Sequence, residues 1–312
     1  MITIIIILTL AVIFSTIINY ISEYAFNKAF NKHKKTEEEA YAYLKKKNVL
    51  DLDIYKEVTR EEVSLNSLDG ILLKGYLIEK YPESNRYIIL VHGYTANNHI
   101  DMSYVRFFIK EGFNVLLIDQ RAHGNSQGTY PSYGYYEQDD VSRWINFLYR
   151  RKGEELFLGL HGQSLGGATV LMCGAKNDKV DFIIEDCGYS SGKEIIKYQI
   201  KLVKWVPLNS VYLLLNHKIK KRVGFSLNDV HPIKDIKKCK APILFIHGDK
   251  DTCVPCSMAK KMYDVRKNKN DKLFIVPGAD HMCAYSMKKA EYESICHEFI
   301  ENAELIKNNR RK

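Results

Sequence analysis

One short motif constrains this chain more than any other feature, because it requires a strand, a sharp turn and a helix in that order. The sequence G-Q-S-L-G at residues 162–166 follows the apolar run 156–160 and precedes the helix-like segment 168–173. Glycines on both sides of Ser164 leave room for a strained turn, where a larger side chain would collide with the neighbouring strand or helix. The motif therefore predicts a nucleophile elbow, with Ser164 exposed at the C-terminal edge of a sheet.

Two later apolar runs end in loops that carry an acid and an imidazole. Residues 242–246 lead into the loop that contains Asp251, and residues 272–276 lead into the loop that contains His281. The chain order of serine, acid and histidine differs from both the trypsin-like and the subtilisin-like orders. We expect three strand-end loops to bring Ser164, Asp251 and His281 to one edge of the sheet.

Further landmarks extend the pattern toward the N-terminus. Residues 91–94 read V-H-G-Y, and residues 119–128 follow the pattern D-x-R-x-H-G-x-S-x-G. With these motifs the chain resembles the α/β-hydrolase superfamily from about residue 61 to the C-terminus. It is most similar to bacterial membrane-anchored hydrolases of the monoacylglycerol-lipase-like and serine-aminopeptidase-like kind. The resemblance implies an α/β fold with a mostly parallel central sheet flanked by helices, a small helical cap, and hydrolysis of an ester or amide.

The chemistry assigns one task to each residue. His281 would take the proton of the Ser164 hydroxyl during attack and return it to the leaving group. Asp251 would hold the imidazole in the correct tautomer and stabilise its charged form. Backbone N–H groups of Tyr94 and Leu165 would bind the oxyanion, and the Tyr94 hydroxyl is a weaker candidate for a further donor.

Other acids and histidines compete for these roles. Asp249 lies in the same loop as Asp251, but the family pattern places the acid three residues after the glycine, and Asp249 then reads as a turn residue. Asp280 neighbours His281 and also reads as a turn residue. By resemblance, three further histidines shape loops, namely His92, His123 and His247. Asp139 and Asp140 read as carboxylates at the start of a helix.

The beginning of the chain is long and apolar enough to cross a membrane. Residues 2–21 contain no charged side chain, and about 20 apolar residues span a bilayer as a helix. No positive segment precedes this run and no clear cleavage site follows it, which favours an anchor over a cleaved signal peptide. Lys28, Lys32, Lys34 and Lys35 follow it, so the positive-inside rule predicts that the catalytic part lies on the cytoplasmic side.

These observations predict the following organisation. Residues 1–22 form the transmembrane anchor, residues 23–60 form a charged helical segment that is either a stalk or packs on the core, and residues 61–307 form the hydrolase domain. A cap insertion is expected at about residues 190–240. The predicted helix between residues 36 and 47 does not distinguish a stalk from a packed segment.

The charge of the chain is concentrated in the cap insertion. Residues 190–240 hold twelve Lys or Arg against three acids, a net +9 that equals the net charge of the whole chain. Apolar residues between 195 and 206 alternate with lysines at helical spacing, which predicts a basic amphipathic helix. One hypothesis is that the cap faces an anionic membrane; the alternative is that its lysines only solubilise a cover over an acyl pocket. Nucleic acid is not an expected partner, because the lysines accompany aliphatic residues rather than an aromatic platform.

Seven cysteines show no regular framework, which argues against a disulfide-stapled exported domain. Cys253, Cys256 and Cys283 lie close in sequence to Asp251 and His281, so a redox or metal switch is conceivable, but no zinc pattern is complete. We expect no cofactor and no metal. The sequence therefore predicts a serine hydrolase of carboxylesterase or lipase type acting on small-molecule or lipid esters. Peptidase, thioesterase or acyltransferase chemistry and a non-catalytic binding scaffold remain open alternatives.

Overall fold

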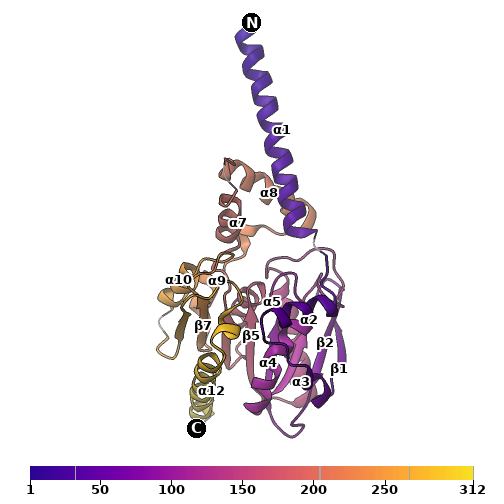
Figure 1. The fold of residues 1–312 in the computed structure, drawn as a ribbon, viewed down its shortest axis with the longest axis vertical. Coiled ribbons are helices and arrows are strands. Elements are labelled where there is room, and N and C mark those ends of the chain that lie inside the picture. The colour runs from indigo at the N-terminus through magenta and orange to yellow at the C-terminus, as the bar shows by residue number, and fades with distance from the viewer. Residues whose placement is uncertain (32, 204, 267, 312) are drawn as a thin grey trace. The chain divides into compact units, whose positions relative to one another are not determined.

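A computed structural model describes residues 1–31, 33–203, 205–266 and 268–311. The chain forms two compact units, and each is built from segments that are distant in sequence (Figure 1). One unit joins residues 1–33 to residues 191–230, and we call it the anchor–cap unit. The other unit comprises residues 34–190 and 231–312, and we call it the hydrolase unit.

The hydrolase unit is organised around one sheet of eight strands, in the order β1-β2-β4-β3-β5-β6-β7-β8. The pairs β1/β2 and β2/β4 are antiparallel, and all the other neighbouring pairs are parallel. The C-terminal ends of β3, β5, β6, β7 and β8 therefore lie along one edge. The strands are β1 (Glu61–Asn66), β2 (Leu72–Ile78), β3 (Arg86–Val91), β4 (Asn114–Ile118), β5 (Phe157–Gln163), β6 (Phe182–Asp186), β7 (Ile243–Gly248) and β8 (Lys272–Val276).

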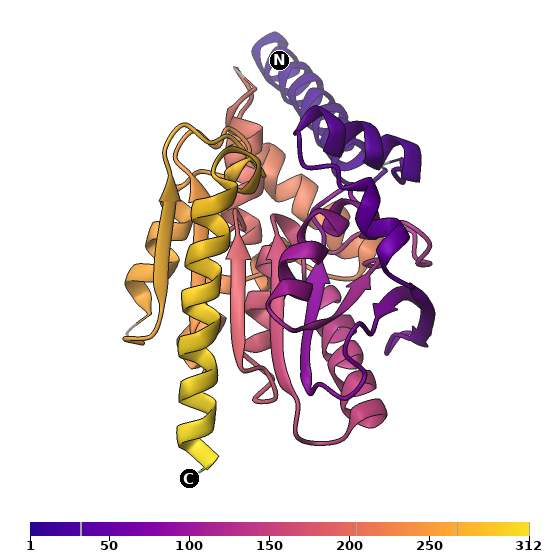
Figure 2. The same ribbon diagram turned by 60° about the horizontal axis from the view of Figure 1, so that its bottom comes forward.

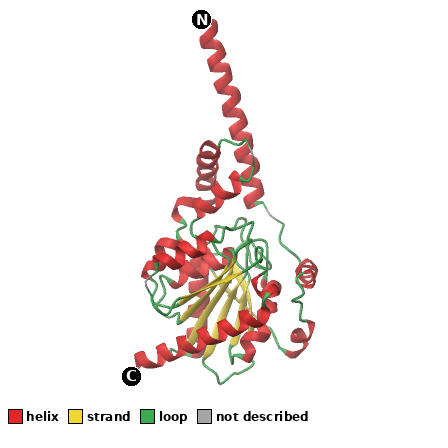
Figure 3. Cartoon of the chain, turned by 60° about the vertical axis from the view of Figure 1, so that its left-hand side comes forward, coloured by secondary structure: helices red, strands yellow, loops and turns green. Residues whose placement is uncertain are grey.

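Both faces of the sheet are covered, which explains why its central strands are apolar without alternation. Strands β3 to β7 are buried almost throughout their length. One face packs against α4 (Asn98–Lys110), α11 (Ala284–Met287) and α12 (Lys289–Arg311). The opposite face packs against α5 (Glu137–Lys152), α6 (Leu165–Gly174) and α10 (Ser257–Val265). Figure 2 shows α12 in yellow along the strands, and Figure 3 shows the strands between helical layers.

The charged segment after the anchor folds onto the hydrolase unit. Helix α2 (Glu37–Lys46) begins at Thr36, whose side chain accepts a hydrogen bond from the Glu39 N–H while the Glu39 carboxylate accepts one from the Thr36 N–H. This capping box satisfies two donors at the helix start. Its apolar face, Ala40 and Leu44, is buried in a cluster with Ile100 of α4. Within the predicted segment 23–60, α2 is therefore packed on this unit, whereas residues 23–30 continue helix α1 (Ile2–Phe30) of the other unit. The short helices α3 (Leu52–Glu57) and α9 (Pro232–Asp235) and the 3₁₀ turn η2 (Ile236–Lys238) complete this unit.

The anchor–cap unit contains α1 (Ile2–Phe30), α7 (Gly192–Lys201), α8 (Leu208–Val223) and the 3₁₀ turn η1 (Leu227–Asp229). Among the described residues, α1 is the one helix long and apolar enough to cross a membrane, and most of its apolar stretch is exposed. The prediction of a continuous basic helix through residue 206 is wrong, because α7 ends at Lys201. Pro207 disfavours helical backbone at the residue before it and precedes α8. Lys204 lies outside the described residues.

Candidate active site

The strand–turn–helix expected around Ser164 is formed by β5 and α6. Ser164 has φ 53° and ψ −112°, a backbone conformation that non-glycine residues rarely adopt. The turn is tight, because a Cβ on Gly162 would lie 2.3 Å from the Gly166 carbonyl oxygen, and one on Gly166 would lie 1.9 Å from that of Val91. Glycine is therefore required on both sides of the serine.

The structure brings Ser164, His281 and Asp251 into one hydrogen-bonded series. His281 follows β8, and its Nε2 lies 2.9 Å from Ser164 Oγ. Its Nδ1 lies 2.7 Å from Oδ2 of Asp251, which follows β7. A carboxylate oxygen only accepts hydrogen bonds, so Nδ1 is assigned the proton and Nε2 is left to accept the Ser164 hydroxyl. This is the tautomer that a histidine base requires.

The Asp251 carboxylate is held on both oxygens. Its Oδ1 accepts hydrogen bonds from the backbone N–H groups of Cys253 at 2.8 Å and Val254 at 2.7 Å. Burial alone would raise the pKa of Asp251, but hydrogen bonds from His247 and His281, together with that from the Val254 N–H, outweigh burial and lower the pKa well below its usual range. The carboxylate is therefore ionised over the whole range in which a histidine titrates.

His247 is a contact of the acid that the sequence did not reveal. Its Nε2 lies 3.2 Å from Asp251 Oδ2 and 2.9 Å from the carbonyl oxygen of Val254. Both neighbours accept hydrogen bonds, so Nε2 carries a proton and donates. Burial opposes the charged form of His247, but the hydrogen bonds to Asp251 and to the Val254 carbonyl favour it, and the pKa of His247 is raised. The expectation that His247 only shapes its loop was therefore incomplete, although its spacing of four residues from Asp251 offered a signal.

The competing acids have other partners. Asp249 Oδ1 accepts a hydrogen bond from the Gly278 N–H at 2.6 Å. Asp280 Oδ1 accepts from the Thr252 N–H and hydroxyl and from the His281 N–H, as expected of a turn carboxylate. Asp140 lies in the first turn of α5 as predicted, and it also forms a buried ion pair with Arg121 at 2.7 Å. The carboxylate on the His281 imidazole is instead that of Asp251.

His92 and His123 shape the loops beside the serine. His92 Nε2 accepts a hydrogen bond from the Gln120 N–H at 3.0 Å, and His123 Nε2 accepts one from the Thr95 N–H at 3.2 Å. Burial lowers the pKa of each imidazole to about 4. Both rings are therefore neutral near pH 7, in keeping with their acceptor role.

The two predicted oxyanion donors belong to segments next to Ser164. Leu165 is the first residue of α6 and follows the serine directly. Tyr94 follows Gly93, where an added Cβ would lie 3.3 Å from Ser164 Cβ. The next two N–H groups are engaged elsewhere, since Thr95 donates to His123 and Ala96 donates to the Gly93 carbonyl. The Tyr94 ring stacks on Tyr133 with 5.9 Å between centroids.

Two carboxylates at the end of β6 are fully buried behind the serine. Burial raises the pKa of Glu185 to about 8 and that of Asp186 to about 6. Glu185 Oε1 accepts the Gly188 N–H, and Asp186 Oδ2 accepts the Tyr292 hydroxyl at 3.2 Å. The Asp186 carbonyl oxygen accepts the Ser164 N–H at 2.8 Å. Nothing in the sequence distinguishes these two residues from ordinary carboxylates.

None of the cysteines near the site forms a disulfide among the described residues. Cys283 Sγ lies 2.8 Å from Lys47 Nζ, whereas Cys253 is exposed and Cys256 is partly exposed. The grouping with metal-ligand spacing is a different one, formed by Cys187, Asp251 and His281. Burial raises the pKa of the Cys187 thiol well above its usual range. A neutral thiol is a poor metal ligand, so these residues fit the hydrogen-bonded arrangement better than a metal centre.

A small pocket of the hydrolase unit reaches the neighbours of the serine and histidine. Its walls come from α2 and its C-terminal flank, from α4 and from the segment after His281. They include two chain neighbours of the central residues, Gln163 and Met282. The remaining lining residues are Tyr43, Leu44, Lys47, Val49, Ile100, Ser103, Tyr104, Tyr285 and Ser286.

Comparisons with known proteins agree with this architecture. The model of the α/β hydrolase fold matches residues 87–209. The chain is 30% identical over 250 residues to the protein YqkD of Bacillus subtilis (strain 168), covering 80% of this chain and 81% of that protein. It therefore belongs to the α/β-hydrolase family.

Two further likenesses concern the membrane and the fold. A membrane protein of Saccharomyces cerevisiae (strain ATCC 204508 / S288c), YNL320W, is 25% identical over 238 residues, covering 75% of this chain and 78% of the yeast protein. Among solved structures, the Pyrococcus furiosus esterase Pf2001 superposes with a TM-score of 0.66 at 22% identity, covering 81% of this chain and 96% of that one. At that identity the match concerns the fold.

Proposed function

We propose that this protein is a membrane-anchored serine hydrolase that cleaves carboxylic esters through an acyl-enzyme intermediate. The observation that carries the proposal is the series Ser164 Oγ, His281 and Asp251, joined at 2.9 and 2.7 Å. Family membership and the structural likeness to an esterase support the same reading. The proposed substrate is a small-molecule or lipid ester.

In the proposed reaction the Ser164 hydroxyl attacks the ester carbonyl while His281 Nε2 takes its proton. Asp251 stabilises the resulting imidazolium, and His281 then protonates the leaving alcohol. The N–H groups of Tyr94 and Leu165 are the proposed donors to the oxyanion. A water molecule activated by His281 then releases the acid from Ser164.

The proposed location is a membrane crossed once by α1, with the hydrolase unit on the cytoplasmic side. The exposed apolar surface of α1 supports the anchor, as does the likeness to a yeast membrane protein. The assignment to the cytoplasmic side is based on the lysines that follow the apolar run 2–21 in sequence. A protease that cleaves the hydrolase unit of intact cells from outside would contradict this orientation.

The test is hydrolysis of a ladder of p-nitrophenyl esters, from short to long acyl chains, by the full chain in detergent and by Ser164→Ala. We expect the alanine variant to lose at least about a thousandfold in rate, because the nucleophile is removed. Labelling by a fluorophosphonate should disappear in the same variant.

The other outcomes separate the alternatives. Labelling without ester hydrolysis would favour an amide or thioester substrate for the same serine. Equal hydrolysis by both proteins would place the activity elsewhere. Neither labelling nor hydrolysis would favour a binding scaffold.

A further inference from the structure

The turn between α7 and α8 exposes three large apolar side chains. Leu202 and Val203 are each 57% exposed, and Trp205 is 99% exposed. Apolar side chains gathered on a surface in this way mark a contact with a partner or a membrane. We call Leu202, Val203 and Trp205 the cap tip.

The cap is attached to the anchor helix within one compact unit. Glu23 of α1 accepts charged hydrogen bonds from Lys218 at 2.8 Å and from Arg222 at 2.6 and 2.9 Å. Lys218 also donates to the Asn19 carbonyl oxygen at 3.1 Å. The Arg222 guanidinium lies 4.7 Å from the centroid of the Phe26 ring. Helix α8 is therefore held against the C-terminal part of α1.

This attachment places the cap at the level where the apolar span of α1 ends. Residues 2–22 would extend about 31 Å at 1.5 Å per residue, close to the roughly 30 Å thickness of a bilayer core. Glu23 is the first charged side chain of the helix. Residues 2–17 are exposed, whereas Ile18, Ser22, Phe26 and Phe30 form a buried stripe along one side of the helix. Contact with the cap therefore begins about one turn before the predicted boundary of the membrane.

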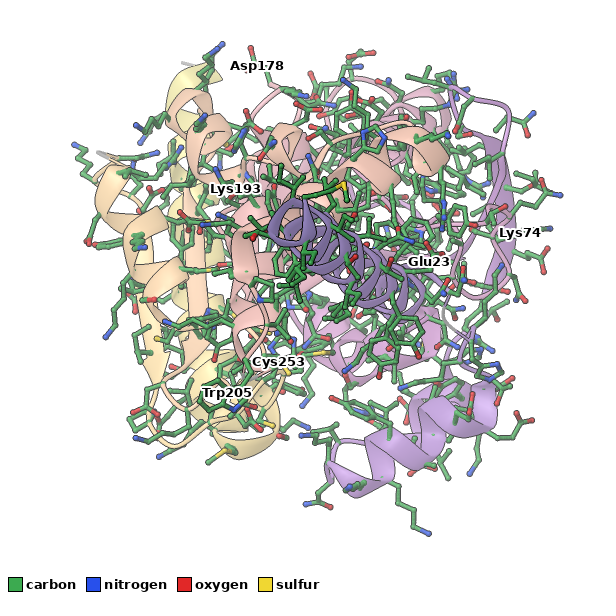
Figure 4. The ribbon with its side chains drawn as sticks, turned by 90° about the horizontal axis from the view of Figure 1, so that it is seen from above. Glu23, Lys74, Asp178, Lys193, Trp205 and Cys253 are labelled. Carbon is green, nitrogen blue, oxygen red and sulfur yellow. The ribbon has the colours of Figure 1, made fainter. Side chains whose placement is uncertain are left out.

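The cap tip lies at the end of the cap that faces the N-terminal part of α1. In Figures 1 and 3, α7 and α8 lie beside the C-terminal part of α1, and their connecting turn is at the upper end of the pair. Figure 4 looks down on the N-terminal end of α1 and shows Glu23 near this helix and Trp205 to one side of it. The tip is therefore displaced sideways from the anchor, at the same end of the unit as the membrane span.

Exposed lysines lie on both helices of the cap. Lys201 directly precedes the tip, Lys193 lies in the first turn of α7, and Lys220 and Lys221 lie in the last turn of α8. Apolar and tryptophan side chains interspersed with lysine are typical of segments that lie in a membrane interface. Basic residues on the cytoplasmic side are attracted by the anionic lipids of that leaflet.

We propose that the cap tip is a second membrane contact. Leu202, Val203 and Trp205 would insert at the headgroup–acyl boundary of the leaflet that surrounds the C-terminal end of the α1 span. Lys201, next to the tip, and Lys193, on the same helix, bind anionic headgroups. This inference rests on α1 as the anchor but not on the proposed catalysis. Two contacts displaced from each other would fix the orientation of the anchor–cap unit on the membrane, which one helix alone would leave free to rotate.

The chain provides its own probe for this contact. It contains two tryptophans, Trp205 at the tip and Trp144, which is fully buried in the hydrolase unit. The full chain is reconstituted in nanodiscs, and tryptophan emission is measured with ordinary and with brominated phosphatidylcholine, each mixed with phosphatidylglycerol. We expect brominated lipid to quench the Trp205 emission several-fold. Trp205→Phe, which leaves only Trp144, should show no such quenching.

Aqueous acrylamide distinguishes the other possibilities. Emission from Trp205 that acrylamide quenches and brominated lipid does not would overturn the proposal. Protection from both quenchers would also overturn it, and would indicate a protein partner or a second copy of the chain. Failure of the full chain to enter the discs would overturn the anchor and the tip together. None of these readouts depends on whether Ser164 is a nucleophile.

A charge variant tests the role of the lysines. Lys193→Glu combined with Lys201→Glu should reduce quenching by brominated lipid in discs that contain phosphatidylglycerol. The matched control is Lys260→Glu combined with Lys261→Glu, which makes the same charge change on exposed residues of α10 in the other unit. Equal quenching in the two double variants would contradict the headgroup contact.

Discussion

The His247 imidazole donates a hydrogen bond to the Asp251 carboxylate at 3.2 Å, on the same oxygen that His281 contacts at 2.7 Å. Both imidazoles therefore donate to one carboxylate oxygen and stabilise its ionised form. The imidazole on the serine is that of His281, whereas His247 Nε2 contacts Asp251 and the Val254 carbonyl. Its role in the proposed reaction is to position Asp251.

Replacing His247 separates positioning from catalysis. His247→Phe removes the donor to Asp251 Oδ2, so we expect kcat to fall about tenfold with little change in KM, since the lost stabilisation concerns the transition state. His247→Gln can donate an N–H in the same place and should recover most of the rate. The measurement is kcat and KM for ester hydrolysis by the unchanged protein, His247→Phe and His247→Gln. Equal losses in both variants would indicate a structural role for the ring instead.

The acid itself is tested by an isosteric change. Asp251→Asn should lower kcat by roughly three to four orders of magnitude, because an amide no longer stabilises the imidazolium and favours the wrong tautomer. Asp249→Asn is the matched control in the same loop and should retain near-normal activity. Circular dichroism checks that both variants are folded. Comparable losses in the two variants would reopen the assignment of the acid.

The tight elbow predicts a steric effect at Gly166. Gly166→Ala places a Cβ 1.9 Å from the Val91 carbonyl oxygen, so β3 and α6 must separate. We expect activity to be lost and the free energy of unfolding to fall by about 2–4 kcal/mol. Gly70→Ala is the control, because Gly70 has φ +82° with open space around it. That variant should lose about 1–2 kcal/mol through backbone strain alone and keep its activity. Denaturant unfolding and ester hydrolysis report the two effects.

The raised pKa of Glu185 predicts how stability depends on pH. Its pKa rises from 4.5 to about 8 on burial, so between these values the folded state binds more protons than the unfolded state. The stabilising contribution is fully present below pH 4.5 and is lost as the pH rises through 8, with a slope of at most about 1.4 kcal/mol per unit. Glu185→Gln retains an acceptor for the Gly188 N–H and should show a smaller slope. Thermal unfolding of both proteins in detergent across this range tests the sign, and a steeper slope in the variant would contradict it.

The sequence predicted best those features that depend on local pattern and strand order. Strand β8 coincides with the apolar run 272–276, and the α/β fold that the family resemblance implied is the fold observed. The loops of Ser164, Asp251 and His281 meet because parallel strands end at one edge. The catalytic role of these residues remains a prediction.

Other features depend on packing that residue order does not specify. His247 contacts Asp251 because the loop after β7 folds back toward the end of that strand. Glu185 and Asp186 appear in sequence as ordinary strand-end carboxylates, yet both are fully buried. The spacing of apolar residues up to position 206 predicted a helix that is too long. Spacing alone does not show that Leu202 and Val203 are exposed after α7 has ended.

The pairing of Glu23 with Lys218 has a consequence for biosynthesis. The two residues are 195 positions apart, so at translation rates of about 5–20 residues per second Glu23 is made roughly 10–40 s before its partner. With α1 as the proposed anchor, the helix would enter the membrane before its partner on α8 exists, and most of the sheet would be synthesised in the interval. Helix α8 would then bind a helix that is already in place.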